Sequence, residues 1–149
     1  MKLQISSRLA IFALLELAGH PDRQFSVADI GRKYQVSNHH LAKIMHALGR
    51  AGMVRSVRGA GGGYQISANV RRITLLDIIE LFEPFGSTGG NVEAGDATDE
   101  GRALGEVVGE IDNIARATLG SITFATMLNL VGRYRDADRA VPRRSQRPT

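Results

Sequence analysis

A glycine-rich turn between two strand-like segments constrains the fold more than any other feature of the chain. Residues 53–57 and 64–67 are short and strand-like, and Arg58-Gly59-Ala60-Gly61-Gly62-Gly63 separates them. Glycine adopts positive φ without steric cost, so this run favours a hairpin turn. Exposed backbone N–H groups beside two arginines suit a phosphate backbone or a minor groove. The sequence predicts a basic hairpin, whose contact residues are Arg55, Arg58, Gly59, Gly61, Gly62 and Tyr64.

A nucleotide site is the alternative function for this loop, because glycine-rich loops also cradle phosphates. A nucleotide-binding loop of that kind has a following Lys-Ser/Thr pair and opens a helix after a strand. Neither feature is present here. An enzyme is also disfavoured, because the chain has no Cys and no serine in a nucleophile motif.

Two short helices with a tight turn are predicted before the hairpin. Ser26 precedes apolar residues at helical spacing, and Asp29 completes an approximate capping box. Gln35-Val36 forms the turn, and Ser37 caps a second helix. The apolar face of that helix consists of Leu41, Ile44, Met45 and Leu48. A helix-turn-helix followed by a hairpin is typical of a winged DNA-binding domain.

The second of these helices is expected to meet the major groove of DNA with its first turn. Its polar face is rich in hydrogen-bond donors, which suit base edges and phosphates. An ordinary solvated face is the alternative, and the adjoining helix and hairpin argue against it. Arg8 on the first predicted helix either reaches a phosphate or is a solvated arginine. The residues assigned to DNA on these helices are Arg8, Ser37, Asn38, His39, His40 and Lys43.

The distribution of charge divides the chain into three parts. Residues 1–72 have eleven Lys or Arg against three Asp or Glu, a net +8. Residues 73–132 have two Arg against ten acidic residues, a net −8, and residues 133–149 have six Arg against two Asp, a net +4. A basic N-terminal half is the electrostatic footprint of a protein that binds double-stranded DNA. The acidic part would be repelled by DNA and is expected to face away from it.

Membrane and metal partners are not predicted. No apolar run is long enough to span a bilayer, and the N-terminus has the pattern of an amphipathic helix instead of a signal peptide. A cytoplasmic location in a prokaryote is therefore expected. The absence of Cys excludes disulfides and thiolate ligands. His39 and His46 are seven residues apart and form at most a weak metal-binding pair, so no metal site is predicted.

The residues of the predicted wing, Ser56-Val57-Arg58-Gly59-Ala60-Gly61-Gly62-Gly63-Tyr64, resemble the wing of the IscR/NsrR-type bacterial transcriptional regulators. Ile73-Thr74-Leu75-Leu76-Asp77-Ile78-Ile79 resembles the next helix of that family, and the similarity runs from about Leu3 to about Val131. The resemblance implies a small homodimeric protein, mainly α with a small β-wing, in which a long helix joins two winged helix-turn-helix domains.

Four segments are expected along the chain. Residues 1–84 form the DNA-binding domain, with the helix around Leu9 and Leu17 as its floor. Residues 85–102 form an acidic, Gly-rich loop of the kind that serves as a sensor. Residues 103–132 comprise a dimerisation helix and a short closing helix, and residues 133–149 form a flexible Arg-rich tail. Near the end of the first segment, the carboxylates of Asp77, Glu80 and Glu83 are interpreted as a solvated helix face.

In many members of the resembling family, three cysteines of this loop hold an iron–sulfur cluster. The corresponding stretch here has no thiolate, and Arg102 lies near the position of the third cysteine. The family members that use a non-Cys ligand place it on the first helix, where this chain has Arg8 and Phe12, which cannot serve. No cofactor is therefore predicted. The chain is either a natural cluster-free member or a variant whose cysteines were replaced, and Arg102 favours the natural one.

A long amphipathic helix is predicted over Ala103–Leu119, broken by Gly120 and followed by a short helix over Phe124–Val131. Its apolar face is broader than one small domain needs. In the resembling family the equivalent helix crosses its symmetry mate, and burial within one chain is the alternative. The residues assigned to the dimer are Leu104, Val107, Val108, Ile111, Ile114 and Thr118.

The leading hypothesis is a homodimeric, sequence-specific transcriptional regulator without a Cys-ligated cluster. It is taken to be a repressor that reads a palindromic operator with the helix starting at Ser37 and the Arg58 wing. One alternative is a winged-helix module regulated by a partner protein or a small ligand. Another is a cluster-binding sensor whose cysteines were replaced.

Overall fold

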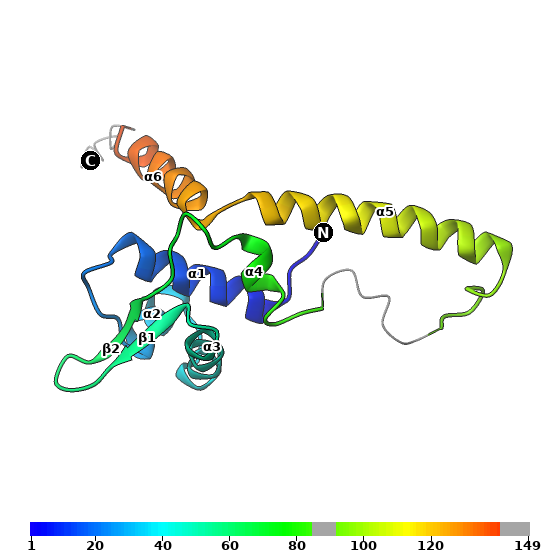
Figure 1. Ribbon diagram of the computed structural model, residues 1–149. Helices are drawn as coiled ribbons and strands as arrows, with labels where there is room; N and C mark the ends of the chain where they lie inside the picture. Colours follow the sequence, from blue (N-terminus) through cyan, green and yellow to red (C-terminus); the bar gives the residue numbers. More distant parts are fainter. Residues whose placement is uncertain (85–91, 141–149) are drawn as a thin grey trace, which may run out of the picture.

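The computed structural model describes residues 1–84 and 92–140, and most of them are helical (Figure 1). The helices are α1 (Ile5–Gly19), α2 (Val27–Tyr34), α3 (Asn38–Arg50), α4 (Leu75–Ile79), α5 (Asp99–Ser121) and α6 (Phe124–Ala140). The strands β1 (Val54–Val57) and β2 (Gly63–Ile66) pair antiparallel, with Val54 opposite Ile66 and Val57 opposite Gly63. The predicted class, mainly α with a small β-wing, is confirmed.

Capping side chains begin three of these helices where the sequence predicts them. Ser26 and Asp29 form a reciprocal capping box at α2, because each side chain accepts from the other residue's backbone N–H. Thr74 and Asp77 form the same arrangement at α4. The Ser37 hydroxyl accepts from the backbone N–H of His40 at α3. Each cap satisfies backbone donors that the first helical turn leaves without a partner.

Helix α1 is the centre of the hydrophobic core, as expected of the domain floor. Its Leu14 and Leu17 are fully buried, and α1 packs against α3, α4, α6 and β2. The other elements contribute side chains to the same cluster: Ile30 from α2, Leu41, Ile44, Met45 and Leu48 from α3, Ile78 and Ile79 from α4, and Phe124 from α6. The apolar face predicted for the second helix is therefore the one that α3 buries.

The acidic residues before the long helix form a solvated face only in part, because Asp77 and Glu80 are exposed, as predicted, whereas Glu83 is half-buried. Asp77 is occupied by the α4 cap, and Glu80 forms an ion pair with Arg116 of α5. Glu83 accepts hydrogen bonds from the Ser7 hydroxyl and the Gln4 backbone N–H at the start of α1, at 2.7 and 2.9 Å. Helix spacing alone could not reveal these partners, because they lie far away in the sequence.

Helix α5 is longer than predicted. It begins at Asp99, capped by Thr98, so the last residues of the expected loop 85–102 are helical. Gly120 does not break it, and it ends at Ser121. Figure 1 shows α5 extending away from the rest of the chain, and Leu119 near its end is the residue that it buries. Residues 85–91, which include Gly86 and Asn91 of the expected loop, lie outside the described residues.

Helix α6 is also longer than predicted. It begins after Thr123, whose hydroxyl accepts from the Thr126 backbone N–H, and it continues to Ala140. The expected flexible tail is therefore wrong for residues 133–140, while residues 141–149 lie outside the described residues. Low hydropathy led to the wrong prediction, although the first residue that disfavours a helix in this part of the chain is Pro142. Helix α6 packs on α1 of the domain that contains the helix-turn-helix.

Candidate nucleic-acid interface

The first turn of α3 presents polar side chains on the surface. Asn38, His39 and Lys43 are exposed, whereas His40 is half-buried. The His40 ring lies 3.3 Å from the Ser6 hydroxyl of α1, so one ring nitrogen is already engaged there. His39 and Lys43 lie on the opposite face of α3 from the core residues, as a helix that enters the major groove requires, whereas Asn38 faces α2 and His40 faces α1. Ser37 contributes its hydroxyl to the cap, which fixes where this turn begins.

A close approach of α2 to α3 fixes the position of that turn. Gln35 adopts a left-handed conformation with φ 55°, which turns the chain sharply between the helices. A Cβ atom on Gly31 would lie 2.8 Å from Asn38 Oδ1 and 2.9 Å from the Val36 carbonyl oxygen. Only glycine fits at this crossing without displacement of the turn. Gly31 is visible in the sequence, but its role could not be predicted from it, because that role depends on how α2 and α3 cross.

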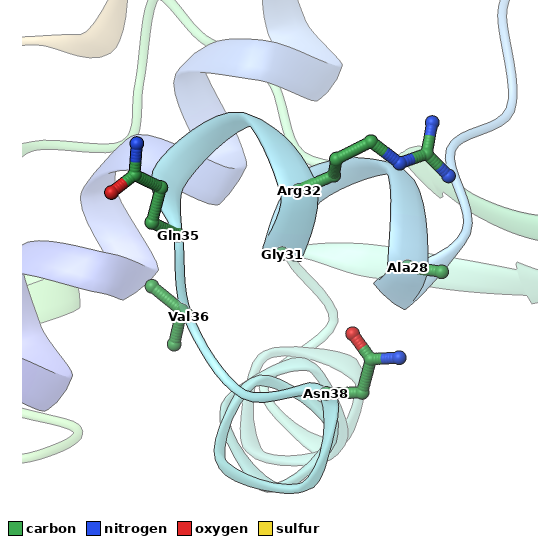
Figure 2. Close-up of a pocket in the computed structure, with 6 residues that line it drawn as sticks. All are labelled: Ala28, Gly31, Arg32, Gln35, Val36 and Asn38. Atoms are coloured by element: carbon green, nitrogen blue, oxygen red, sulfur yellow. The ribbon is translucent and has the colours of Figure 1, made fainter.

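A surface hollow of about 490 Å³ lies between α2 and the start of α3 (Figure 2). Arg32 lines it from α2 and Asn38 from α3, and the turn through Gln35 and Val36 joins the two sides. The Arg32 side chain is 78% exposed, and its distance to Asp29 is 3.9 Å. Sequence reasoning missed Arg32, although an arginine in the first helix of a helix-turn-helix is well placed to contact a phosphate.

The wing projects as a two-stranded hairpin with an exposed glycine tip. Gly59 and Gly61 have φ of 112° and 75°, a region that side chains rarely adopt. Arg58 and Gly59 are exposed at the tip, and Gly62 is half-buried. The Arg55 guanidinium donates to Gln65 Oε1 of the facing strand at 2.8 Å, so this side chain is engaged across the hairpin. The tip thus combines accessible backbone with the Arg58 cation.

Tyr64 has a structural role that the sequence did not reveal. Its backbone N–H and C=O exchange hydrogen bonds with Phe25 at 2.8 and 3.0 Å, which extends the sheet by one bridge. The bridge attaches the wing to the residues immediately before α2. Arg23 lies next to it, with its guanidinium carbon 4.6 Å from the Phe25 ring centroid. Contact of the Tyr64 side chain with DNA remains a prediction.

Arg8 lies on the exposed side of α1, and its guanidinium is 5.8 Å from the Phe12 ring centroid. It lines a groove that also includes Gln35 and Val36, so it is adjacent to the turn of the helix-turn-helix. Both interpretations of Arg8, as a phosphate contact and as a solvated arginine, remain compatible with this position.

The apolar residues of α5 are exposed in the single chain. We call them the α5 stripe: Leu104, Val107, Val108, Ile111 and Ile114, which are between 42% and 65% exposed. Thr118 is also exposed, and its hydroxyl donates to the Ile114 carbonyl. The alternative of burial within one chain is therefore wrong for the described residues. An apolar stripe of this length on a helix surface is typical of a protein–protein contact.

Within residues 1–84 and 92–140, no three His, Cys, Asp or Glu side chains lie close enough together to hold a metal ion. No helix in the same residues is sufficiently long and apolar to cross a membrane.

Comparison with known proteins agrees with this arrangement. The model of the Rrf2 family, described as an iron-dependent transcriptional regulator, matches residues 3–130. An HTH-type transcriptional regulator of Rhodopseudomonas palustris, named BadM, is 47% identical over 133 residues, which cover 88% of this chain and 83% of the relative. CymR, the global cysteine regulator of B. subtilis, has a similar structure, with a TM-score of 0.72 and 30% identity over 87% of this chain and 98% of that one.

IscR of T. potens has a TM-score of 0.70 and is 27% identical, and the match covers 100% of this chain and 93% of that chain. The resemblance to IscR-type regulators, drawn from the wing residues, is thereby confirmed. The family model spans the helix-turn-helix, the wing, all of α5 and the start of α6. The chain therefore belongs to the Rrf2 family of transcriptional regulators.

Proposed function

We propose that the protein is a homodimeric repressor that reads a palindromic operator with the start of α3 and the Arg58 wing. The main support for the proposal is that one chain presents two separate surfaces, namely the start of α3 with the wing and the α5 stripe. In Figure 1, α3 and the β1–β2 hairpin lie on the side of the molecule opposite α6, and α5 extends away from both. Such a chain can contact DNA and a second copy at the same time.

The exposed α5 stripe supports the homodimer. Burying a large aliphatic side chain stabilises a complex by about 1.5–3 kcal/mol, and the stripe has five of them. A second copy of the same stripe is a complementary partner, because a two-fold axis brings identical surfaces together. Two-fold symmetry then matches a palindrome, in which each half-site meets one α3.

The residues at the start of α5 support regulation without a Cys-ligated iron–sulfur cluster. Clusters of this kind are held by thiolates, and the chain has no Cys. Arg102 forms an ion pair with Asp99 in the first turn of α5, which places a cation where the resembling family has a ligand. This donor set does not fit a cluster. Under this proposal the protein senses its signal in another way, through a small ligand or a partner protein.

The function is tested by selection of genomic DNA fragments with the purified protein, followed by fluorescence anisotropy on the selected site. We expect a palindromic sequence to be enriched. Arg58→Ala should weaken binding about tenfold per half-site and reduce the slope of log K against log salt by about one per chain, because one phosphate contact is lost. Arg139→Ala, an exposed arginine of α6, is the matched control and should bind normally.

Circular dichroism of both variants should match the wild type, because Arg58 is exposed and has no role in the core. Equal affinity of Arg58→Ala and the wild type at fixed salt would refute the assignment of the wing. Enrichment of non-palindromic DNA would refute recognition of the operator by a two-fold symmetric dimer.

A further inference from the structure

A groove of about 580 Å³ lies between α1, the end of α2 and α6, and Figure 1 shows that α6 lies on the side of the molecule away from α3. Its volume falls within the range of about 300–1,000 Å³ that is typical of small-molecule sites. The walls are half-buried and apolar, with Phe12 and Leu15 on one side and Leu128 and Val131 on the other. The groove lies outside the surface that is proposed to contact DNA and outside the α5 stripe.

The groove is elongated along both helices that form it. Its lining residues run from Phe12 to Gly19 on α1 and from Met127 to Arg135 on α6. Seven helical residues span about 10 Å at 1.5 Å per residue. Leu128, Val131 and Arg135 are spaced by three and four residues and so lie on one face of α6. A ligand that follows the groove is therefore extended, and one end of it meets the Arg135 guanidinium.

The other charges of the groove are already balanced. The buried Glu16 carboxylate accepts hydrogen bonds from Lys33 Nζ at 2.5 Å and from the Tyr34 hydroxyl at 3.1 Å. Burial raises the pKa of Glu16, but the hydrogen bonds from Lys33 and Tyr34 together with the nearby positive charge outweigh it, so this pKa lies below its usual value. Burial and then the Glu16 charge raise the pKa of Tyr34 to about 12, and Arg135 opposes that rise. Arg135 and Tyr34 both line the groove.

We propose that this groove binds a medium-chain alkyl monocarboxylate, with its chain against Leu128 and Val131 and its carboxylate on Arg135. Glu16 and Lys33 neutralise each other, so Arg135 supplies the one unbalanced charge among the residues that line the groove or pair with them. A single anionic head complements one guanidinium, which binds carboxylates with paired N–H donors. A cationic head would be repelled, and an uncharged chain would leave the charge-assisted hydrogen bonds unmade.

The groove is placed to influence DNA binding. Tyr34 is the last residue of α2, and its ring stacks on Phe12 at 5.2 Å between centroids with an interplanar angle of 12°. The next residue, Gln35, makes the turn into α3. A chain seated between α6 and Tyr34 therefore acts directly on the element that positions α3. This regulatory part of the inference rests on the proposed function, whereas ligand binding itself does not.

Isothermal titration calorimetry of the full chain with octanoate tests the binding. We expect saturable binding of one octanoate per chain, and at least tenfold weaker binding by Arg135→Gln, because a charge-assisted hydrogen bond is lost. Arg133→Gln is the matched control, since Arg133 is exposed on the same helix two residues away and does not line the groove. It should bind octanoate as the wild type does, and octylamine should not bind to either protein.

Absence of saturable octanoate binding would overturn the proposal, as would equal affinity of Arg135→Gln and Arg133→Gln. Occupation of the groove by a second copy would overturn it as well, and would appear as a change of oligomeric state in Arg135→Gln. Anisotropy with the selected DNA then measures the regulatory part, for which at least a threefold change in DNA affinity is expected at saturating octanoate. If octanoate binds but no DNA site is selected, the proposed ligand site is supported and the proposed DNA-binding function is refuted.

Discussion

The crossing of α2 and α3 gives the sharpest prediction for the DNA-binding part. Replacement of Gly31 by Ala places a methyl group 2.8 Å from Asn38 Oδ1 and 2.9 Å from the Val36 carbonyl oxygen. Contacts below 3.0 Å are essentially never observed for real Cβ atoms, so α3 has to move away from α2. The Asn38 side chain can rotate, but Val36 contributes backbone, which moves only with the turn.

The change in the free energy of unfolding caused by Gly31→Ala is the sum of two opposing effects. Ala is preferred over Gly inside a helix by about 1 kcal/mol. Overpacking at a close contact costs about 1–3 kcal/mol. Gly49→Ala in α3 isolates the first effect, because no atom lies within 4 Å of a Cβ added there. The difference in the free energy of unfolding between the two variants should therefore equal the strain alone, about 1–3 kcal/mol, with Gly31→Ala the less stable.

Urea denaturation followed by circular dichroism, at one fixed protein concentration, measures this difference. Anisotropy with the selected DNA measures the second consequence. Because the clash displaces the first turn of α3, Gly31→Ala should lose DNA affinity while remaining folded, and Gly49→Ala should keep it. Equal unfolding free energies for Gly31→Ala and Gly49→Ala would refute the crossing geometry on which the placement of α3 depends.

Two further predictions concern the α5 stripe and the buried Glu16. Ile111→Asp should weaken the dimer by about 3 kcal/mol, or roughly 100-fold, because both copies lose a buried side chain; sedimentation velocity measures it, and an unchanged dimer would contradict the role of the stripe. Glu16→Gln should cost about 1.5 kcal/mol of stability at pH 7. Since the folded pKa of Glu16 is lowered, its contribution is present above the unfolded pKa and is lost as pH falls through the folded value. The wild type and Glu16→Gln should therefore converge in stability at acidic pH, and a constant difference across that range would count against the ion pair with Lys33.

The DNA-binding half could be predicted because its signals are local. Ser26 with Asp29, Thr74 with Asp77 and the cap at Ser37 each act within one helical turn, so spacing alone reveals them. The alternation of core and polar positions in α3 is likewise a property of one helix. The glycine tip of the wing is local too, because positive φ at Gly61 is a requirement of the turn itself.

The features that could not be predicted depend on contacts between distant segments. Tyr64 bonds to Phe25, and the partners of Glu83 lie at the start of α1, so no spacing rule connects them. The length of α6 was missed for a different reason. Its C-terminal turns have exposed arginines and aspartates and so lack an apolar stripe, but such residues do not interrupt helical hydrogen bonds as proline does.

The acidic middle of the chain has a more specific role than keeping away from DNA. Glu80 pairs with Arg116 and so connects the end of α4 to α5, while Glu83 connects the same segment to the start of α1. These two carboxylates add to the packing and backbone hydrogen bonds that orient the α5 stripe relative to the core that positions α3. In the proposed dimer, the distance between the two α3 helices is set by that orientation, and so is the spacing of the half-sites. Under the proposed function, the carboxylates that the sequence assigns to a solvated face thus help determine which operator the two chains can span.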